Sequence, residues 1–112
     1  MKTYVIDIDG TICSDSFGEY EKAEPIKSRI DFVNKLYQEG NQIIFFTARG
    51  MGSSGHNIEV AKEKWFDFTK KQLDGWGVKY HSLFLGKPAA DRYIDDKGVS
   101  PEIFFGDQPI TM

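Results

Sequence analysis

Two aspartates at the end of an apolar run, Asp7 and Asp9, are the residues best suited to chemistry in this sequence. Gly10 and Thr11 follow them directly. In a β-strand, residues two apart point to the same side, so we expect both carboxylates to share one small volume. Two like charges this close are unfavourable unless a cation lies between them or one carries a proton. Turn formation explains an Asp-Gly pair, but it leaves Asp7 unexplained.

Polar side chains also follow the other predicted strands. These further candidates are Thr47 at the end of residues 42–47 with Arg49 beyond it, Lys87 after residues 78–85, and Asp95 and Asp96 after residues 92–94. Because parallel strands end at one edge of their sheet, these groups should open on the same edge. Carboxylate oxygens suit Mg²⁺, while hydroxyl, ammonium and backbone amide groups suit phosphate oxygens. The set therefore predicts a phosphoryl-transfer site.

Alternating strand and helix patterns would position these groups. The expected strands are residues 4–8, 42–47, 78–85, 92–94 and 103–105. One expected helix starts with Pro25 at its first position and stops at Gly40, and the other runs from a cap at Asn57 to Gly75. Such alternation indicates an α/β domain with a parallel sheet and helices on its faces.

Length and charge narrow the class of protein. A chain of 112 residues with 40% hydrophobic and 14% aromatic residues is typical of a single folded domain, here residues 1–112. The net charge of -3 argues against a partner such as nucleic acid, which requires a basic stripe. One cysteine, Cys13, cannot form an internal disulfide, and neither a long apolar stretch nor a signal-like start is present. We therefore expect a cytoplasmic protein without a membrane partner.

The ordered candidates resemble the four motifs of the haloacid dehalogenase-like phosphohydrolases. The matching residues are Asp7-Ile8-Asp9-Gly10-Thr11, Thr47, Lys87 and Asp95-Asp96, within a resemblance that spans residues 4 to about 105. Residues 46–49, 86–88 and 93–102 are similar to small members associated with capsule and surface-sugar biosynthesis. The resemblance implies a three-layer α/β/α, Rossmann-like fold with a central parallel sheet. A cap domain is not expected, because the two loops where relatives insert one are short, at about fourteen and about eight residues.

The resemblance also implies a role for each candidate. Asp7 would be the nucleophile that forms an aspartyl phosphate, and Asp9 would be the general acid and then the general base. Phosphate would be held by Gly10, Thr47, Ala48 and Lys87. Mg²⁺, the implied cofactor, would be bound by Asp7, Asp9, Asp95 and Asp96. The expected walls of the open site are Phe17, Tyr20, Arg49, Met51 and His56, of which Tyr20, Arg49 and His56 are the candidates for substrate contact.

Each candidate also has an ordinary structural interpretation, and other functions remain open. Thr47 could simply end a strand, and Lys87 could be a solvated turn lysine. A receiver-like phospho-acceptor domain is one alternative, although the third strand lacks the acceptor aspartate. A silent binding module is another.

The expected substrate is a small phosphorylated metabolite of the phosphosugar type, and a phosphoprotein is the alternative. Exposed Phe17 and Tyr20 beside an uncapped site predict a homo-oligomer that covers the pocket.

Overall fold

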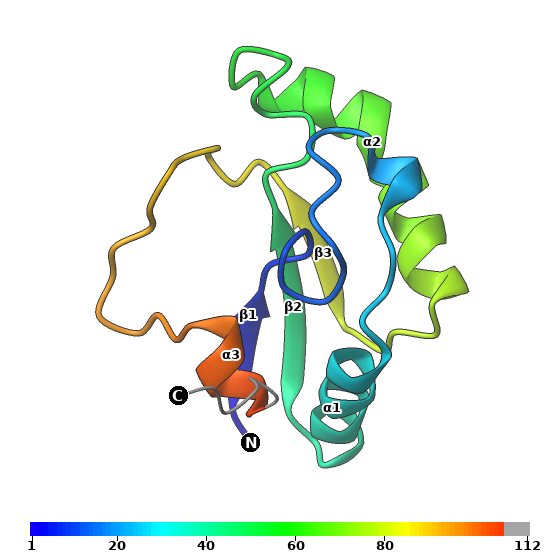
Figure 1. The fold of residues 1–112 in the computed structure, drawn as a ribbon, viewed down its shortest axis with the longest axis vertical. Coiled ribbons are helices and arrows are strands. Elements are labelled where there is room, and N and C mark those ends of the chain that lie inside the picture. The colour runs from blue at the N-terminus through cyan, green and yellow to red at the C-terminus, as the bar shows by residue number, and fades with distance from the viewer. Residues whose placement is uncertain (107–112) are drawn as a thin grey trace, which may run out of the picture.

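The computed structural model describes residues 1–106 of the chain, in which strands and helices alternate (Figure 1). The elements are β1 (Thr3–Ile6), a 3-10 turn η1 (Tyr20–Lys22), α1 (Lys27–Gln38), β2 (Gln42–Thr47), α2 (Ile58–Gly75), β3 (Ser82–Leu85) and α3 (Pro101–Phe105). The predicted strand 42–47 is confirmed with both its bounds, and so is the cap at Asn57, whose side chain accepts a hydrogen bond from the Val60 amide at 3.1 Å.

The three strands form one parallel sheet in the order β1-β2-β3. Their carboxyl ends therefore lie at the same edge, as expected. Side chains on one face are buried and join the buried residues of α1 and α2 in a single core. That core includes Ile6, Phe45 and Leu83 from the strands, Ile30 and Val33 from α1, and Leu73 from α2. On the opposite face, Val5 and Phe84 remain exposed. The predicted α/β, Rossmann-like class with a parallel sheet is confirmed.

Several predicted boundaries are wrong, and hydrogen bonds in a turn explain the first of them. β1 ends at Ile6 rather than at residue 8, because the carbonyl of Ile8 accepts the amides of Thr11 and Ile12 in a turn. β3 begins at Ser82 rather than at residue 78. The first long helix begins at Lys27, two residues after Pro25.

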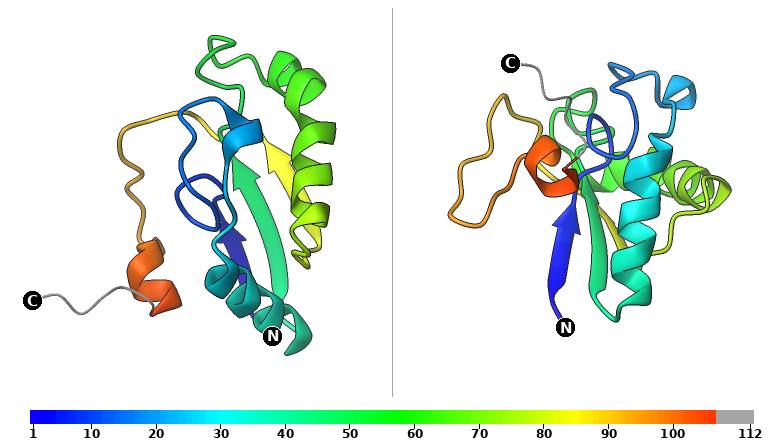
Figure 2. Two further views of the ribbon diagram at one scale, coloured as in Figure 1. Left: turned by 45° about the vertical axis from the view of Figure 1, so that its right-hand side comes forward. Right: turned by 60° about the horizontal axis from the view of Figure 1, so that its bottom comes forward.

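The expected fourth and fifth strands are also wrong. Residues 92–94 lie in an irregular, exposed segment that arcs away from the sheet, as Figures 1 and 2 both show. This short run pairs with no strand of the described residues. Residues 103–105 belong to α3 instead. The Ser100 side chain accepts from the Ile103 amide, Pro101 occupies the first turn, and Gly106 ends the helix with φ 65°. These capping signals outweigh the apolar character of the run.

No helix within residues 1–106 has both the length and the apolar character that crossing a membrane requires.

Candidate active site

A pocket of about 350 Å³ opens at the carboxyl edge of the sheet. Its lining comes from the turn after β1, the segment before α1, the end of β2 and the segment after β3. The lining residues are Asp7, Asp9, Asp15, Gly18, Tyr20, Thr47, Ala48, Arg49, Ala89, Ala90 and Tyr93. The structure therefore brings both motif aspartates, Thr47 and Ala48 into one pocket.

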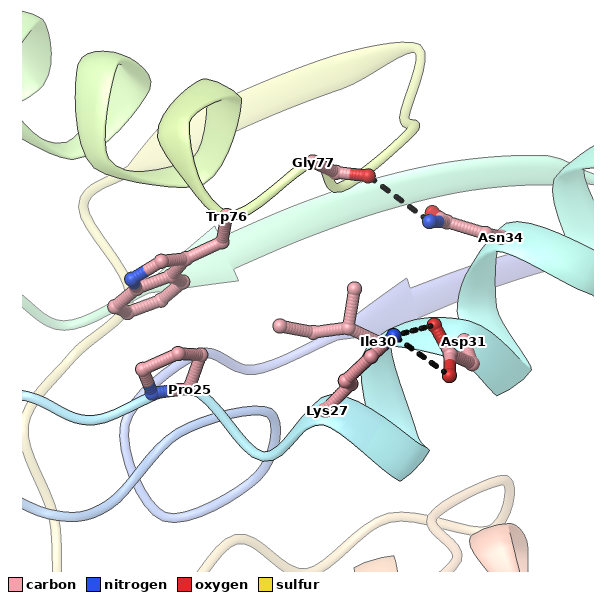
Figure 3. Close-up of a pocket in the computed structure, with 7 residues that line it drawn as sticks. All are labelled: Pro25, Lys27, Ile30, Asp31, Asn34, Trp76 and Gly77. Carbon is pink, nitrogen blue, oxygen red and sulfur yellow. Dashed lines mark hydrogen bonds and ion pairs between the residues drawn. The ribbon is translucent and has the colours of Figure 1, made fainter.

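A second hollow of about 390 Å³ lies between α1 and the end of α2 (Figure 3). Two charged residues line it, Lys27 and Asp31, and they form an exposed ion pair with each other at 3.2 Å. Asn34 donates a hydrogen bond to the Gly77 carbonyl across its far side. This hollow joins two helices and offers no unpaired charged group, so the pocket at the strand ends is the better candidate for chemistry.

The Asp7 carboxylate lies between a cation and a hydroxyl. Lys87 Nζ is 3.7 Å from Asp7 Oδ1, and Thr11 Oγ1 donates to Asp7 Oδ2 at 3.4 Å. Burial raises the pKa of Asp7 above its ordinary value; the Lys87 ammonium and a backbone hydrogen bond from Ile8 oppose this rise, and the Asp9 charge adds to it. Lys87 is itself held near the end of β2, because its amide donates to the Thr47 carbonyl at 3.2 Å. Asp7, Thr47 and Lys87 are thus close neighbours.

Asp7→Asn is expected to raise the melting temperature at pH 7 in metal-free buffer. A carboxyl whose pKa is raised by folding stabilises the protein below its ordinary pKa of 3.8, and that contribution is lost as the pH rises through the folded pKa. Asparagine removes this cost of ionisation. The gain should therefore shrink when thermal unfolding is repeated near pH 3.5. A variant that melts below the wild type at pH 7 would contradict the direction of the shift.

The turn after β1 places Asp9 by means other than strand alternation. Gly10 has φ 79°, a conformation that glycine adopts readily, and its amide donates to the Cys13 carbonyl at 3.0 Å. This amide, expected to bind phosphate, is therefore engaged within the turn. The backbones of Asp9 and Cys13 form an isolated β-bridge. Asp9 reaches the pocket because the chain curls back on itself here.

Cys13 is buried within that turn, and we expect its thiol to be inert. Its Sγ is 3.5 Å from the Ile8 carbonyl and 3.6 Å from Asp9 Oδ1. Burial raises the pKa of Cys13 from 9.0 to about 12. Since the thiolate is the reactive form, this shift alone should slow labelling by a disulfide reagent at pH 8 about 10³-fold relative to the unfolded chain. Absorbance of the released thiol measures both rates, and equal rates would contradict the burial.

Arg49 lies where the sequence did not lead us to expect it. We predicted a substrate contact, but its side chain is fully buried and donates to Asp9 through Nε and a terminal nitrogen, each at 2.9 Å. Its other terminal nitrogen donates to Thr69 Oγ1 at 3.2 Å and to Gln72 Oε1 at 2.7 Å. The guanidinium therefore faces a carboxylate of the site and α2 rather than solvent.

The other expected walls of the pocket fall into different environments. Tyr20 lines the pocket and is half-buried, with its ring 4.6 Å from that of Trp65. Met51 is buried, and Phe17 is 88% exposed. His56 Nε2 accepts from the Ala89 amide at 3.2 Å, so it joins the glycine-rich loop to the segment after β3. Of these four, Tyr20 is the one that lines the pocket.

Tyr93 is a pocket residue that the sequence reasoning missed. Its ring centre lies 4.1 Å from Lys87 Nζ, a cation–π contact, and its hydroxyl donates to the Pro88 carbonyl. We expected Tyr93 inside a strand. Because residues 92–94 are irregular instead, the chain can place the Tyr93 ring against Lys87. A tyrosine six residues after a lysine carries no periodic signal that would have predicted the contact.

Asp95 and Asp96, expected to bind Mg²⁺, are exposed on the same irregular segment. Asp95 Oδ1 accepts from the Lys97 amide at 2.6 Å, a local turn. Within residues 1–106, no three or more His, Cys, Asp or Glu side chains lie close enough together to hold a metal ion. The donors as placed therefore do not fit the expected magnesium site, because the strand that would carry Asp95 to the sheet edge is not formed.

Comparisons with known proteins support the fold. No protein-family model matches the chain, and no curated protein matches it. The crystal structure of a structural-genomics target from Vibrio cholerae is 28% identical, with a TM-score of 0.88 over 97% of this chain and 91% of that one. A D,D-heptose bisphosphate phosphatase from B. bronchiseptica, crystallised with magnesium and phosphate, is 17% identical, with a TM-score of 0.55. That match covers 81% of this chain and 52% of the phosphatase. The described residues 1–106 therefore share a Rossmann-like α/β fold with this phosphatase, and they include no cap domain.

Proposed function

We propose that the protein is a phosphomonoester hydrolase that works through an aspartyl phosphate on Asp7. The observation that carries this proposal is the convergence of Asp7, Thr47 and Lys87 at the strand ends, with Asp9 lining the same pocket. A carboxylate beside an ammonium and a hydroxyl can attack phosphorus while the cation offsets charge on the phosphate oxygens. The likeness in fold to a phosphatase agrees with this interpretation.

The proposed reaction has two steps, and its atoms balance. An Asp7 oxygen forms a bond to phosphorus while the bond to the ester oxygen breaks, and the leaving oxygen takes a proton from Asp9. Water then attacks phosphorus and returns its proton to Asp9, which restores the Asp7 carboxylate and releases inorganic phosphate. Asp7 must be ionised at the start, whereas Asp9 must carry a proton, so the two carboxyls divide the work.

The pocket favours a small substrate. Its volume of about 350 Å³ falls at the lower end of the usual range for small-molecule sites. A phosphosugar-type metabolite matches that size, and the polar wall that includes Asp15 could accept hydrogen bonds from sugar hydroxyls. We therefore favour this substrate class over a phosphoprotein. Mg²⁺ stays in the proposal because the phosphatase of like fold was crystallised with magnesium; of the four proposed ligands, Asp7 and Asp9 line the pocket.

Phosphate release from p-nitrophenyl phosphate and from a panel of phosphorylated sugars tests the proposal. We expect turnover in MgCl₂ and loss of it in EDTA, with sugar phosphates preferred over a phosphopeptide. A receiver-like domain would take up one phosphoryl group without turnover, and a binding module would release none. Full activity in EDTA, or none in MgCl₂, would contradict the assignment.

A further inference from the structure

Arg49 combines complete burial with a position beside the proposed reaction. Its side chain is fully shielded from solvent, whereas that of Asp9, its partner, is 20% exposed. A buried guanidinium is stable only when its donors are satisfied. Here three groups satisfy them, namely Asp9, Thr69 and Gln72. Arg49 borders the pocket, but its side chain has no exposed surface, so its influence on the reaction should pass through the residues that it touches.

We propose that Arg49 is a positioning residue that fixes the Asp9 carboxylate and links it to the flap, which we define as residues 14–22. This inference rests on the proposed function, because it takes Asp9 as the acid and base. The two parallel hydrogen bonds of 2.9 Å fix both the position and the plane of the carboxylate. A single cation at the same place would attract Asp9 without fixing its plane.

The guanidinium is in turn held by the framework. Thr69 and Gln72 come from the inward side of α2, and the Arg49 amide donates to Thr47 Oγ1 at 3.2 Å. Although Asp9 lies in a turn, Arg49 therefore connects its carboxylate to β2 and α2, which are both regular elements. Such support matters because a shift of about 1 Å in a catalytic group can cost about 10²-fold in rate.

The same residues hold the flap. The Tyr20 ring lies over the Arg49 guanidinium, with 4.8 Å between its centre and Cζ. Gln72 Nε2 donates to the Tyr20 carbonyl at 2.8 Å, and the Gly50 amide donates to the Tyr20 hydroxyl at 3.0 Å. Gly18 and Tyr20 line the pocket, so the flap would form the wall that faces the leaving group. Arg49 and Gln72 therefore hold both this wall and the acid, Asp9.

Arg49→Lys tests the positioning role, because it keeps the charge and removes the paired geometry. The rate of the first step is measured in single turnovers, with MgCl₂ present, on phenyl phosphate and on p-nitrophenyl phosphate. Phenol is the poorer leaving group and needs the proton more. We expect a loss of roughly 10- to 100-fold on phenyl phosphate, a loss below about 3-fold on p-nitrophenyl phosphate, and KM within about 3-fold on both.

Two further variants make the test specific. In an Asp9→Asn background, Arg49→Lys should add no further loss, since its effect passes through Asp9. Gln72→Met removes one anchor of the guanidinium and should show the same dependence on leaving group with a smaller loss, roughly 3- to 10-fold. Gln72→Met also keeps the inference testable if Arg49→Lys does not fold. Lys70→Ala, on the exposed side of α2, is the control and should leave both rates unchanged.

The outcomes separate the inference from the proposed function. Equal losses on both esters, a full loss in the Asp9→Asn background, or an unaffected Arg49→Lys in an active protein would overturn the positioning role alone. An inactive wild type would defeat the proposed function and this inference together.

Discussion

Asp7→Asn is expected to abolish turnover, with a fall in kcat of roughly 10⁶-fold, the scale on which a covalent enzyme loses activity with its nucleophile. The amide has a similar size to the carboxylate but cannot form the bond to phosphorus. Lys87 and Thr47 would still be in place, so a substrate analogue such as inorganic phosphate should still bind. Steady-state release of phosphate from p-nitrophenyl phosphate measures the loss.

Asp31→Asn is the matched control for this change. Asp31 lines the other hollow and pairs with Lys27 on an exposed helix face, so its activity should stay within about twofold of the wild type. If Asp7→Asn retained more than about one hundredth of the activity, then Asp7 would be a binding group rather than the nucleophile.

Arg49→Met should lower the free energy of unfolding by about 3–5 kcal/mol, the usual cost of removing one partner of a buried ion pair. Methionine fills much of the volume, but it leaves the Asp9 carboxylate, which is 20% exposed, without its cation and leaves Thr69 and Gln72 without their donor. In a domain of this size, that cost corresponds to a fall in melting temperature of roughly 12 °C or more. Thermal unfolding followed by circular dichroism measures it.

Two comparisons show whether the cost comes from the unpaired carboxylate. In the double variant Arg49→Met with Asp9→Asn, the loss should be clearly smaller than the sum of the two single losses. Lys70→Met breaks a fully exposed ion pair on the same helix, and its melting temperature should hardly change. If Arg49→Met has the same melting temperature as the wild type, the Asp9–Arg49 pair does not stabilise the fold.

Local sequence patterns predicted an element correctly where its secondary-structure propensity agrees with its burial in the fold. The run 42–47 is apolar and β-branched and lies between two strands, so propensity and burial point the same way. The run 103–105 has similar composition, yet Ser100 and Pro101 before it and Gly106 after it make it a helix. Capping residues outside the run therefore decided its structure, and a reading of the run alone missed them.

Some residues of the candidate site were also predictable from the local sequence, and others were not. Asp7, Thr47 and Lys87 were predictable because each lies at or just beyond the end of a strand, and parallel strands end at one edge. The place of Arg49 was not predictable, because it depends on Thr69 and Gln72, which lie 20 and 23 residues further along the chain. Asp95 and Asp96 illustrate the opposite error, since their expected place required a strand that residues 92–94 do not form.

The covalent intermediate on Asp7 is the central claim, and the mass of the Asp9→Asn variant tests it most directly. This variant keeps the nucleophile but lacks the base for the second step, so the aspartyl phosphate should accumulate. The protein is mixed with p-nitrophenyl phosphate and MgCl₂, quenched in acid, and weighed intact and as peptides. We predict one added phosphoryl group, located on Asp7 and absent from the Asp7→Asn variant. Release of nitrophenol without any adduct, or an adduct on another residue, would contradict the account.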